Sequence, residues 1–198
     1  MSTRDDILNA VRGHGPAPQP LPEVPDFASG STDLVNLFTS ALERLDGKVI
    51  KPPSSGLDAW LPTAFPDATR ICSAVPEVTG NVDLTTFSSW AEPADVDVMV
   101  MRTPLGVAET GSVLLTENEV AVTTAAVLAQ HLLVLLDPAD IVENIHLAYR
   151  YKDFRETAYA VLLSGPSGSA DIGGVTVHPA QGVTTLTVVL APRDGAQQ

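Results

Sequence analysis

The chain has 198 residues, and its 24 acidic residues against 11 Lys and Arg give a formal net charge of −13. This charge argues against nucleic acids and anionic membranes as partners, because phosphate binding requires clustered Lys and Arg. A single cysteine, Cys72, excludes an internal disulfide framework and any iron–sulfur cluster held only by cysteines of this chain. The length is that of one domain with a core of its own, and the cysteine content favours a reducing, cytoplasmic location.

Neither a signal peptide nor a membrane span is expected. The first ten residues, MSTRDDILNA, are charged and lack the apolar centre of a signal peptide. The longest apolar stretch, Val120–Leu136, is interrupted by polar side chains, whereas a membrane helix needs about 18 or more apolar residues in a row.

Residues 1–30 are predicted to be a helix followed by a proline-rich linker. Ser2–Asp5 has the pattern of a helix N-cap, and the apolar residues Ile7 and Val11 follow at helical spacing. The segment Gly15–Asp26 holds five prolines, which favours an extended, semi-rigid tether for that helix.

Residues 31–192 are predicted to form an α/β domain, and residues 193–198 a polar tail. Helices are expected at Leu34–Leu45, Leu57–Leu61, Thr123–Leu128 and Ala139–Lys152. Strands are expected at Lys48–Lys51, Arg70–Val75, the start of Val82–Trp90, Gln130–Leu136, Ala158–Leu163, Val175–His178 and Thr185–Ala191. Asp95–Met101 is either a strand or a helix-to-strand entry, and Glu119–Val122 is expected to be extended. This alternation favours a three-layer α/β/α sandwich with a mostly parallel sheet, in which a ligand crevice is expected outside the carboxyl ends of the strands.

The most informative stretch is Gly106–Leu115, GVAETGSVLL, which is typical of a strand, a turn and a second strand. Glu109 stands between apolar residues, so we expect a buried carboxylate that requires hydrogen-bond partners. Thr110, Gly111 and Ser112 are the nearest candidates for these partners, and they are also candidate substrate-binding residues. Glu109 is therefore a candidate nucleophile or general base, or else a structural carboxylate that caps the turn.

A second polar loop, Ser164–Asp171, follows a predicted strand and reads SGPSGSAD. It offers backbone N–H groups, hydroxyls and one acid, with no Lys or Arg inside it, and it reads either as a binding loop or as a plain turn. The candidate binding residues in it are Gly165, Ser167, Ser169 and Asp171.

Two further positions contain a histidine that could bind a ligand or a metal ion. His131 heads a buried strand and is either a hydrogen-bonded core residue or a third part of the binding site. Glu143 and His146 have the E-x-x-H spacing of di-iron carboxylate proteins, but no second copy exists, so no metal site is predicted.

Taken together, these motifs resemble the LUD domain of the lactate-utilization protein C (LutC) family. Gly106–Leu115 is similar to the family's "-IAETGT-VL" core, and Gln130–Val134 to its "-HI-VV-" strand. Asp140–Val142 is similar to an "-IV-" helix start, and Ser164–Ile172 to "-GPSRTADIE-". The chain departs from the pattern at Gly168, where the family has Arg, and at Gln181, where it has His.

The resemblance implies a fold similar to the NagB/RpiA/CoA-transferase-like group and a role in lactate utilization. This chain would then be a non-redox subunit of an iron–sulfur system that oxidises L-lactate to pyruvate. The iron–sulfur clusters would lie on partner subunits, with no cofactor held here, and a small carboxylate would be the ligand. The resemblance also implies two alternatives: a stand-alone CoA-transferase-like or sugar-phosphate-isomerase-like enzyme that uses Glu109, and a scaffold that has lost its site.

Overall fold

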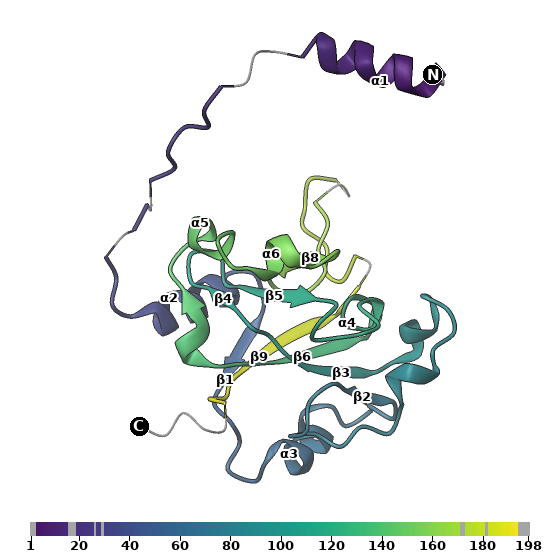
Figure 1. Ribbon diagram of the computed structural model, residues 1–198. Coiled ribbons are helices and arrows are strands. Elements are labelled where there is room, and N and C mark those ends of the chain that lie inside the picture. The colour runs from purple at the N-terminus through teal and green to yellow at the C-terminus, as the bar shows by residue number, and fades with distance from the viewer. Residues whose placement is uncertain are drawn as a thin grey trace.

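A computed structural model describes residues 3–15, 19–25, 27–28, 30–170, 173–180 and 182–193. Its centre is a five-stranded sheet in which every neighbouring pair of strands is parallel, in the order β1-β9-β6-β3-β2 (Figure 1). In that order the strands are β1 (Lys48–Ile50), β9 (Thr185–Leu190), β6 (His131–Leu136), β3 (Val98–Arg102) and β2 (Ile71–Ser73).

A second, four-stranded sheet is mixed, with the order β7-β4-β5-β8. In that order its strands are β7 (Ile141–Val142), β4 (Gly106–Val107), β5 (Ser112–Thr116) and β8 (Ala160–Leu163). The Gly106–Leu115 motif supplies β4 and β5, which pair antiparallel through Gly106–Val113 and Val107–Ser112. The predicted strand–turn–strand is therefore confirmed.

The helices are short, and all but the first lie on the two sides of the parallel sheet (Figure 1). They are α1 (Thr3–Gly13), α2 (Leu34–Glu43), α3 (Leu57–Ala64), α4 (Thr124–Leu128), α5 (Ile145–Ala148) and α6 (Asp153–Glu156). Three 3-10 turns add Leu84–Thr86, Glu92–Asp95 and Pro138–Asp140. Among the helices of the described residues, none is long and apolar enough to cross a membrane.

The core lies on the two faces of the parallel sheet. One face packs against α2, α4 and the mixed sheet, around fully buried residues such as Phe38, Met99 and Leu115. The other face packs against α3 through Leu57 and Leu61. Because both faces are covered, β3 and β6 have nearly continuous apolar sequences rather than alternating ones.

The predicted fold class is confirmed as α/β with a mostly parallel central sheet. The layer above that sheet differs from a purely helical one, because the mixed sheet contributes four strands to it (Figure 1). Helix α1 forms as predicted, yet none of its residues is buried and Figure 1 shows it apart from the sheets. The predicted cap residue Ser2 and the tail beyond Arg193 lie outside the described residues.

The predicted helix at Ala139–Lys152 is wrong. Ile141 and Val142 form β7, Asn144 then caps the four-residue α5 by accepting a hydrogen bond from the Leu147 N–H, and α6 begins only at Asp153. The apolar side chains at Ile141, Ile145 and Ala148 suit helical spacing, but Ile141 is drawn into the mixed sheet by its pairing with Gly106. Glu143 therefore lies between elements, and the E-x-x-H pair does not share one helix.

Two predicted strands are also wrong. In Val82–Trp90 only Val82 pairs, as an isolated bridge to Cys72, and a 3-10 turn follows at Leu84–Thr86, which Asp83 caps through the Thr85 N–H. Within Val175–His178 only Val177 pairs, as an isolated bridge to Ser169. Glu119–Val122, predicted to be extended, contains a turn and bends instead. These segments are short and rich in polar or turn-forming residues, so local capping and loop contacts outweigh their β-propensity.

Candidate functional site

Two glycines allow the predicted loops to pack closely against the end of helix α2. Gly111 has a φ of 63°, and a Cβ built on it would lie 2.3 Å from the backbone nitrogen of Leu42. Gly165 has a φ of 83°, and its Cβ would lie 2.3 Å from the carbonyl oxygen of Leu45. Both positions require glycine because of this close approach and the left-handed backbone. The loops after β4 and β8 therefore meet at the same helix end.

A chain of hydroxyl groups joins the two loops. The Oγ1 of Thr110 lies 2.6 Å from the Oγ of Ser112, which lies 2.5 Å from the Oγ of Ser164. Ser112 is buried, so these hydrogen bonds satisfy a hydroxyl that would otherwise be costly to bury. The structure thus brings Thr110, Gly111, Ser112 and Gly165 together, and adds Ser164, a residue the sequence analysis did not single out.

Glu109 is exposed, which corrects the expectation of a buried carboxylate. Its Oε2 accepts a hydrogen bond from the Ile145 N–H at 3.0 Å, and its own N–H donates to the Glu143 carbonyl at 2.9 Å. β4 ends at Val107, and Glu109 lies in the turn that follows it. It lines a cavity of about 220 Å³ together with Arg44 and Asn144.

Arg44 is the functional candidate that the sequence analysis missed. It follows the last residue of α2 and is exposed, and it lines both the cavity of Glu109 and a second cavity of about 460 Å³ beside Ser164. Its position at the helix end gave no chemical signal in the sequence. Gly111 and Gly165 pack against that end of the helix, so Arg44 lies close to both loops.

His178, which the sequence analysis did not single out, fills the space beside Gly168. A Cβ built on Gly168 would lie 2.4 Å from the Cε1 of His178. The imidazole Nδ1 lies 3.0 Å from the carbonyl oxygen of Ser167, and the Nε2 lies 3.6 Å from the Oδ2 of Asp46. The basic side chain lost at Gly168 is thus matched in space by a histidine from further along the chain.

The other residues of the second loop play backbone roles here. Ser169 pairs with Val177 through two backbone hydrogen bonds, and this pairing positions His178. The N–H of Ser167 donates to the carbonyl of Val183. Asp171, predicted to bind substrate, and Gln181, the second departure from the family pattern, both lie outside the described residues.

The crevice does not lie where a parallel sheet would place it. The Ser164–Gly168 loop borders a further cavity of about 320 Å³ whose lining includes Leu132 and Leu186, the second residues of β6 and β9. The loops therefore reach the amino ends of these strands, not the expected carboxyl ends. They can do so because β5 and β8 are antiparallel strands of the second sheet, to which the rule for parallel strands does not apply.

His131 belongs to a different region. It starts β6 on the α3 side of the parallel sheet, where its Nδ1 lies 2.9 Å from the Oγ1 of Thr185 and its ring packs on Phe65. Burial lowers the pKa of His131, while the nearby Asp97 carboxylate raises it by less. The structure therefore separates His131 from the loops with which it was grouped.

The loop cluster offers a cation, an imidazole and hydroxyls to a small anionic ligand. Arg44 can pair with a carboxylate in two parallel hydrogen bonds, a geometry suited to guanidinium groups. The exposed Glu109 carboxylate can accept a hydrogen bond from a hydroxyl group, or a proton, of a ligand nearby. Within the described residues, no group of three or more His, Cys, Asp and Glu side chains is arranged to hold a metal ion.

Comparison with known proteins is consistent with this architecture. The model of the LUD domain family matches residues 91–191, just over half of the chain. The structure is also similar to the crystal structure of a DUF162 family protein from Deinococcus radiodurans, with a TM-score of 0.60, 14% identity, and coverage of 79% of this chain and 95% of that chain. At that identity the likeness concerns the fold alone. No curated protein matches the sequence.

Proposed function

This chain belongs to the LUD domain family, and on that premise we propose that it is a non-redox subunit of an iron–sulfur system that oxidises L-lactate to pyruvate. Its own part is to hold a small 2-hydroxy or 2-oxo carboxylate at the crevice between the Glu109 and Ser164 loops. The redox groups belong to partner subunits, since one cysteine cannot supply the ligands of a cluster.

One observation carries the proposal. Arg44 lies at the meeting point of the two family motifs and lines the cavities beside both of them. A carboxylate ligand needs a cation, and the sequence has Gly168 where the family motif has Arg. Arg44, with His178 beside Gly168, supplies basic groups from outside the motifs.

The roles of the remaining groups follow from their chemistry. Arg44 binds the carboxylate of the ligand, and the hydroxyls of Thr110 and Ser164 are hydrogen-bonding groups for its 2-oxygen. The exposed Glu109, fixed by the Ile145 N–H, is placed to accept a hydrogen bond from the hydroxyl of a 2-hydroxy acid. Glu109 thereby distinguishes the hydroxy acid from the oxo acid.

The test combines growth with complementation. Deleting the gene is expected to abolish growth on L-lactate as sole carbon source, while growth on glucose continues. The wild-type gene and an Arg70→Gln variant restore growth, because Arg70 is exposed elsewhere on the molecule, at the start of β2. Arg44→Gln restores it poorly.

Two outcomes would contradict the proposal at different levels. Normal growth of the deletion strain on L-lactate removes the role in lactate oxidation. Full complementation by a soluble, folded Arg44→Gln protein removes the ligand site and leaves a scaffold that acts only through its partners.

A further inference from the structure

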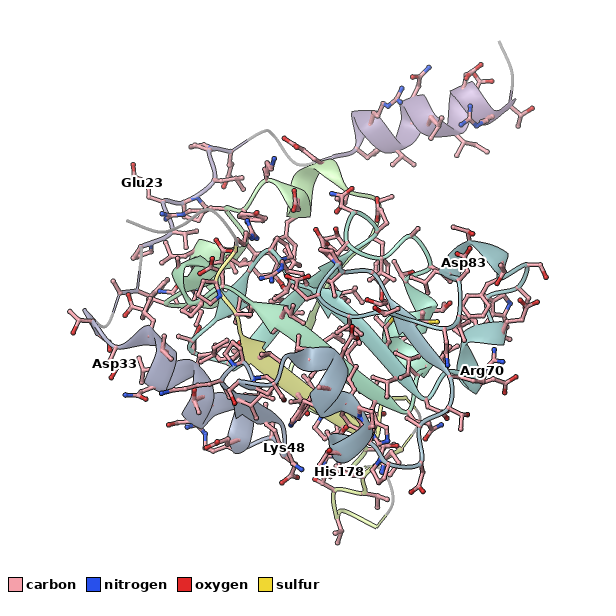
Figure 2. All side chains as sticks on the ribbon, turned by 90° about the horizontal axis from the view of Figure 1, so that it is seen from below. Glu23, Asp33, Lys48, Arg70, Asp83 and His178 are labelled. Carbon is pink, nitrogen blue, oxygen red and sulfur yellow. The ribbon has the colours of Figure 1, made fainter. Side chains whose placement is uncertain are left out.

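Another cavity, larger than those beside the Glu109 and Ser164 loops, lies on the opposite face of the parallel sheet. Its volume is about 750 Å³, within the range of about 300–1,000 Å³ in which small molecules bind. Its floor comes from the amino ends of β1, β6 and β9, and its wall from the end of α3 and the residues after it. Figure 2 views the molecule from the α3 side and shows Lys48 beside that helix.

The floor is polar, which is unusual for a parallel sheet covered on both faces. Lys48 pairs in register with Thr187, and Thr185 with His131, so four polar side chains stand in adjacent positions on one face. Helix α3 has only eight residues, and its core contacts are with apolar residues such as Val98, Leu133 and Val189. The polar row at the amino ends is left open as the floor of the cavity.

One wall is aromatic. The rings of Trp60 and Phe65 meet edge to face with centroids 5.9 Å apart, and Phe65 packs on the His131 imidazole at 4.7 Å. Thr185 fixes that imidazole through its Nδ1, and burial favours the neutral ring by lowering the pKa of His131. This wall presents planar surfaces on which a ring can stack.

The charged side chains that line the cavity limit the charge of the ligands that it can bind. Lys48 is the cationic side chain in its lining, whereas Asp67 and Asp97 are acidic. Asp97 is held in place by the backbone N–H groups of Thr69 and Arg70, at 2.7 and 2.8 Å. One cation against two carboxylates in the lining suits a ligand with one anionic group and disfavours a chain of phosphates.

We propose that this cavity binds a nucleoside monophosphate, with its base on the aromatic wall, its hydroxyls toward the threonines and its single phosphate on Lys48. This site is independent of the lactate role, because it shares no lining residue with the cavities that Arg44 lines. Threonine hydroxyls can donate to or accept from ribose hydroxyls, which suits them to that part of the ligand.

Tryptophan fluorescence of the full chain tests the proposal. The chain has two tryptophans, and Trp90 is 75% exposed and outside the cavity, so Trp90→Phe leaves Trp60 as the reporter. AMP is expected to change the Trp60 emission saturably. Adenosine, without the phosphate, and ATP, with two further phosphates, are each expected to bind more weakly, as is ribose 5-phosphate, which lacks the ring.

Paired lysine variants identify the phosphate contact. Lys48→Gln is expected to weaken AMP binding about tenfold, the scale of one charge-assisted hydrogen bond, and to leave adenosine binding unchanged. Lys51→Gln makes the same charge change at an exposed residue outside the cavity and is expected to leave both affinities as they are. No saturable response to AMP, equal binding of ribose 5-phosphate, or equal AMP affinity in the two lysine variants would each overturn the proposal.

Discussion

Gly111 makes the closest approach between the GVAETGSVLL turn and helix α2. Replacing it with alanine places a Cβ 2.3 Å from the Leu42 nitrogen and forces a side chain onto a backbone with φ of 63°. We expect Gly111→Ala to lower the free energy of unfolding by about 2–4 kcal/mol, because left-handed strain and overpacking add. Urea unfolding followed by circular dichroism measures this loss.

Gly56 provides the matched control for that substitution. Its φ is 82°, but no atom lies within 4 Å of its built Cβ. Gly56→Ala therefore carries the backbone strain alone, about 1–3 kcal/mol, because a φ of 82° with a ψ of 159° is a conformation that side-chain-bearing residues rarely adopt. Equal losses in the two variants would mean that the turn does not press on the helix as the structure has it.

His131 gives stability a pH dependence that can be assigned to one residue. Burial lowers its pKa from the ordinary value of 6.5, and the opposing influence comes from Asp97. At pH values between the folded and the unfolded pKa of His131, the unfolded chain binds more protons than the folded chain. The contribution of His131 to stability is therefore complete above pH 6.5 and is lost as the pH drops through the folded pKa. Besides Asp97, Lys48 and Asp67 line the same cavity.

The expected result is a steeper loss of stability in the wild type than in His131→Asn when the pH is lowered from 7.5 to 5. Urea midpoints at several pH values measure both slopes. Asp97 and Asp137, whose pKa values are held below 3.8 by backbone hydrogen bonds, titrate below this window and contribute to both proteins alike. Parallel slopes would show that the imidazole is as well solvated in the folded protein as in the unfolded one.

Among the elements, helix α2 begins at the predicted residue, Leu34, and is the one on which the site most depends. Asp33 caps it, since its side chain accepts a hydrogen bond from the Asn36 N–H at 3.1 Å. Asp33→Ala is expected to cost about 1 kcal/mol of stability, whereas Asp33→Asn retains an acceptor and costs less. Thermal or urea unfolding of both variants measures the difference, and an equal effect would mean that this cap does not hold the helix.

The strands that the sequence predicts correctly are those whose apolar pattern fits a buried strand and does not fit a helix. His131–Leu136 forms β6 as an apolar run because both of its faces are covered. Ala139–Lys152 was mispredicted because its apolar spacing fits a helix equally well. Only the pairing of Ile141 with Gly106, which lies in a distant segment, decides between the two.

At the scale of the whole molecule, the sequence located the two loops but not the groups around them. Thr110, Ser112 and Gly165 could be singled out because they occur within local motifs. Arg44 and His178 could not, since they join the loops only through the packing of α2 and the pairing of Ser169 with Val177. His131 was grouped with the loops because sequence does not tell which face of the sheet a strand residue occupies.

The N-terminal segment, residues 1–30, is expected to contribute to the stability of the α/β domain only through its last residues. Helix α1 has no buried residue, whereas Phe27 packs on the His146 ring with centroids 4.6 Å apart. Removing residues 1–24 is therefore expected to leave the urea midpoint unchanged. Removing residues 1–30 also removes Phe27 and should cost about 0.5–1 kcal/mol, the scale of one aromatic pair.

The two truncations together decide where the domain begins. Ile7 and Val11 are 59% and 66% exposed, so α1 presents an apolar edge that contributes nothing to the stability of the domain in this structure. If removing residues 1–24 lowers the midpoint as much as removing residues 1–30, α1 packs on the domain or on a second copy in solution. Comparing the midpoints at two protein concentrations then separates these cases, because only packing between copies makes stability depend on concentration.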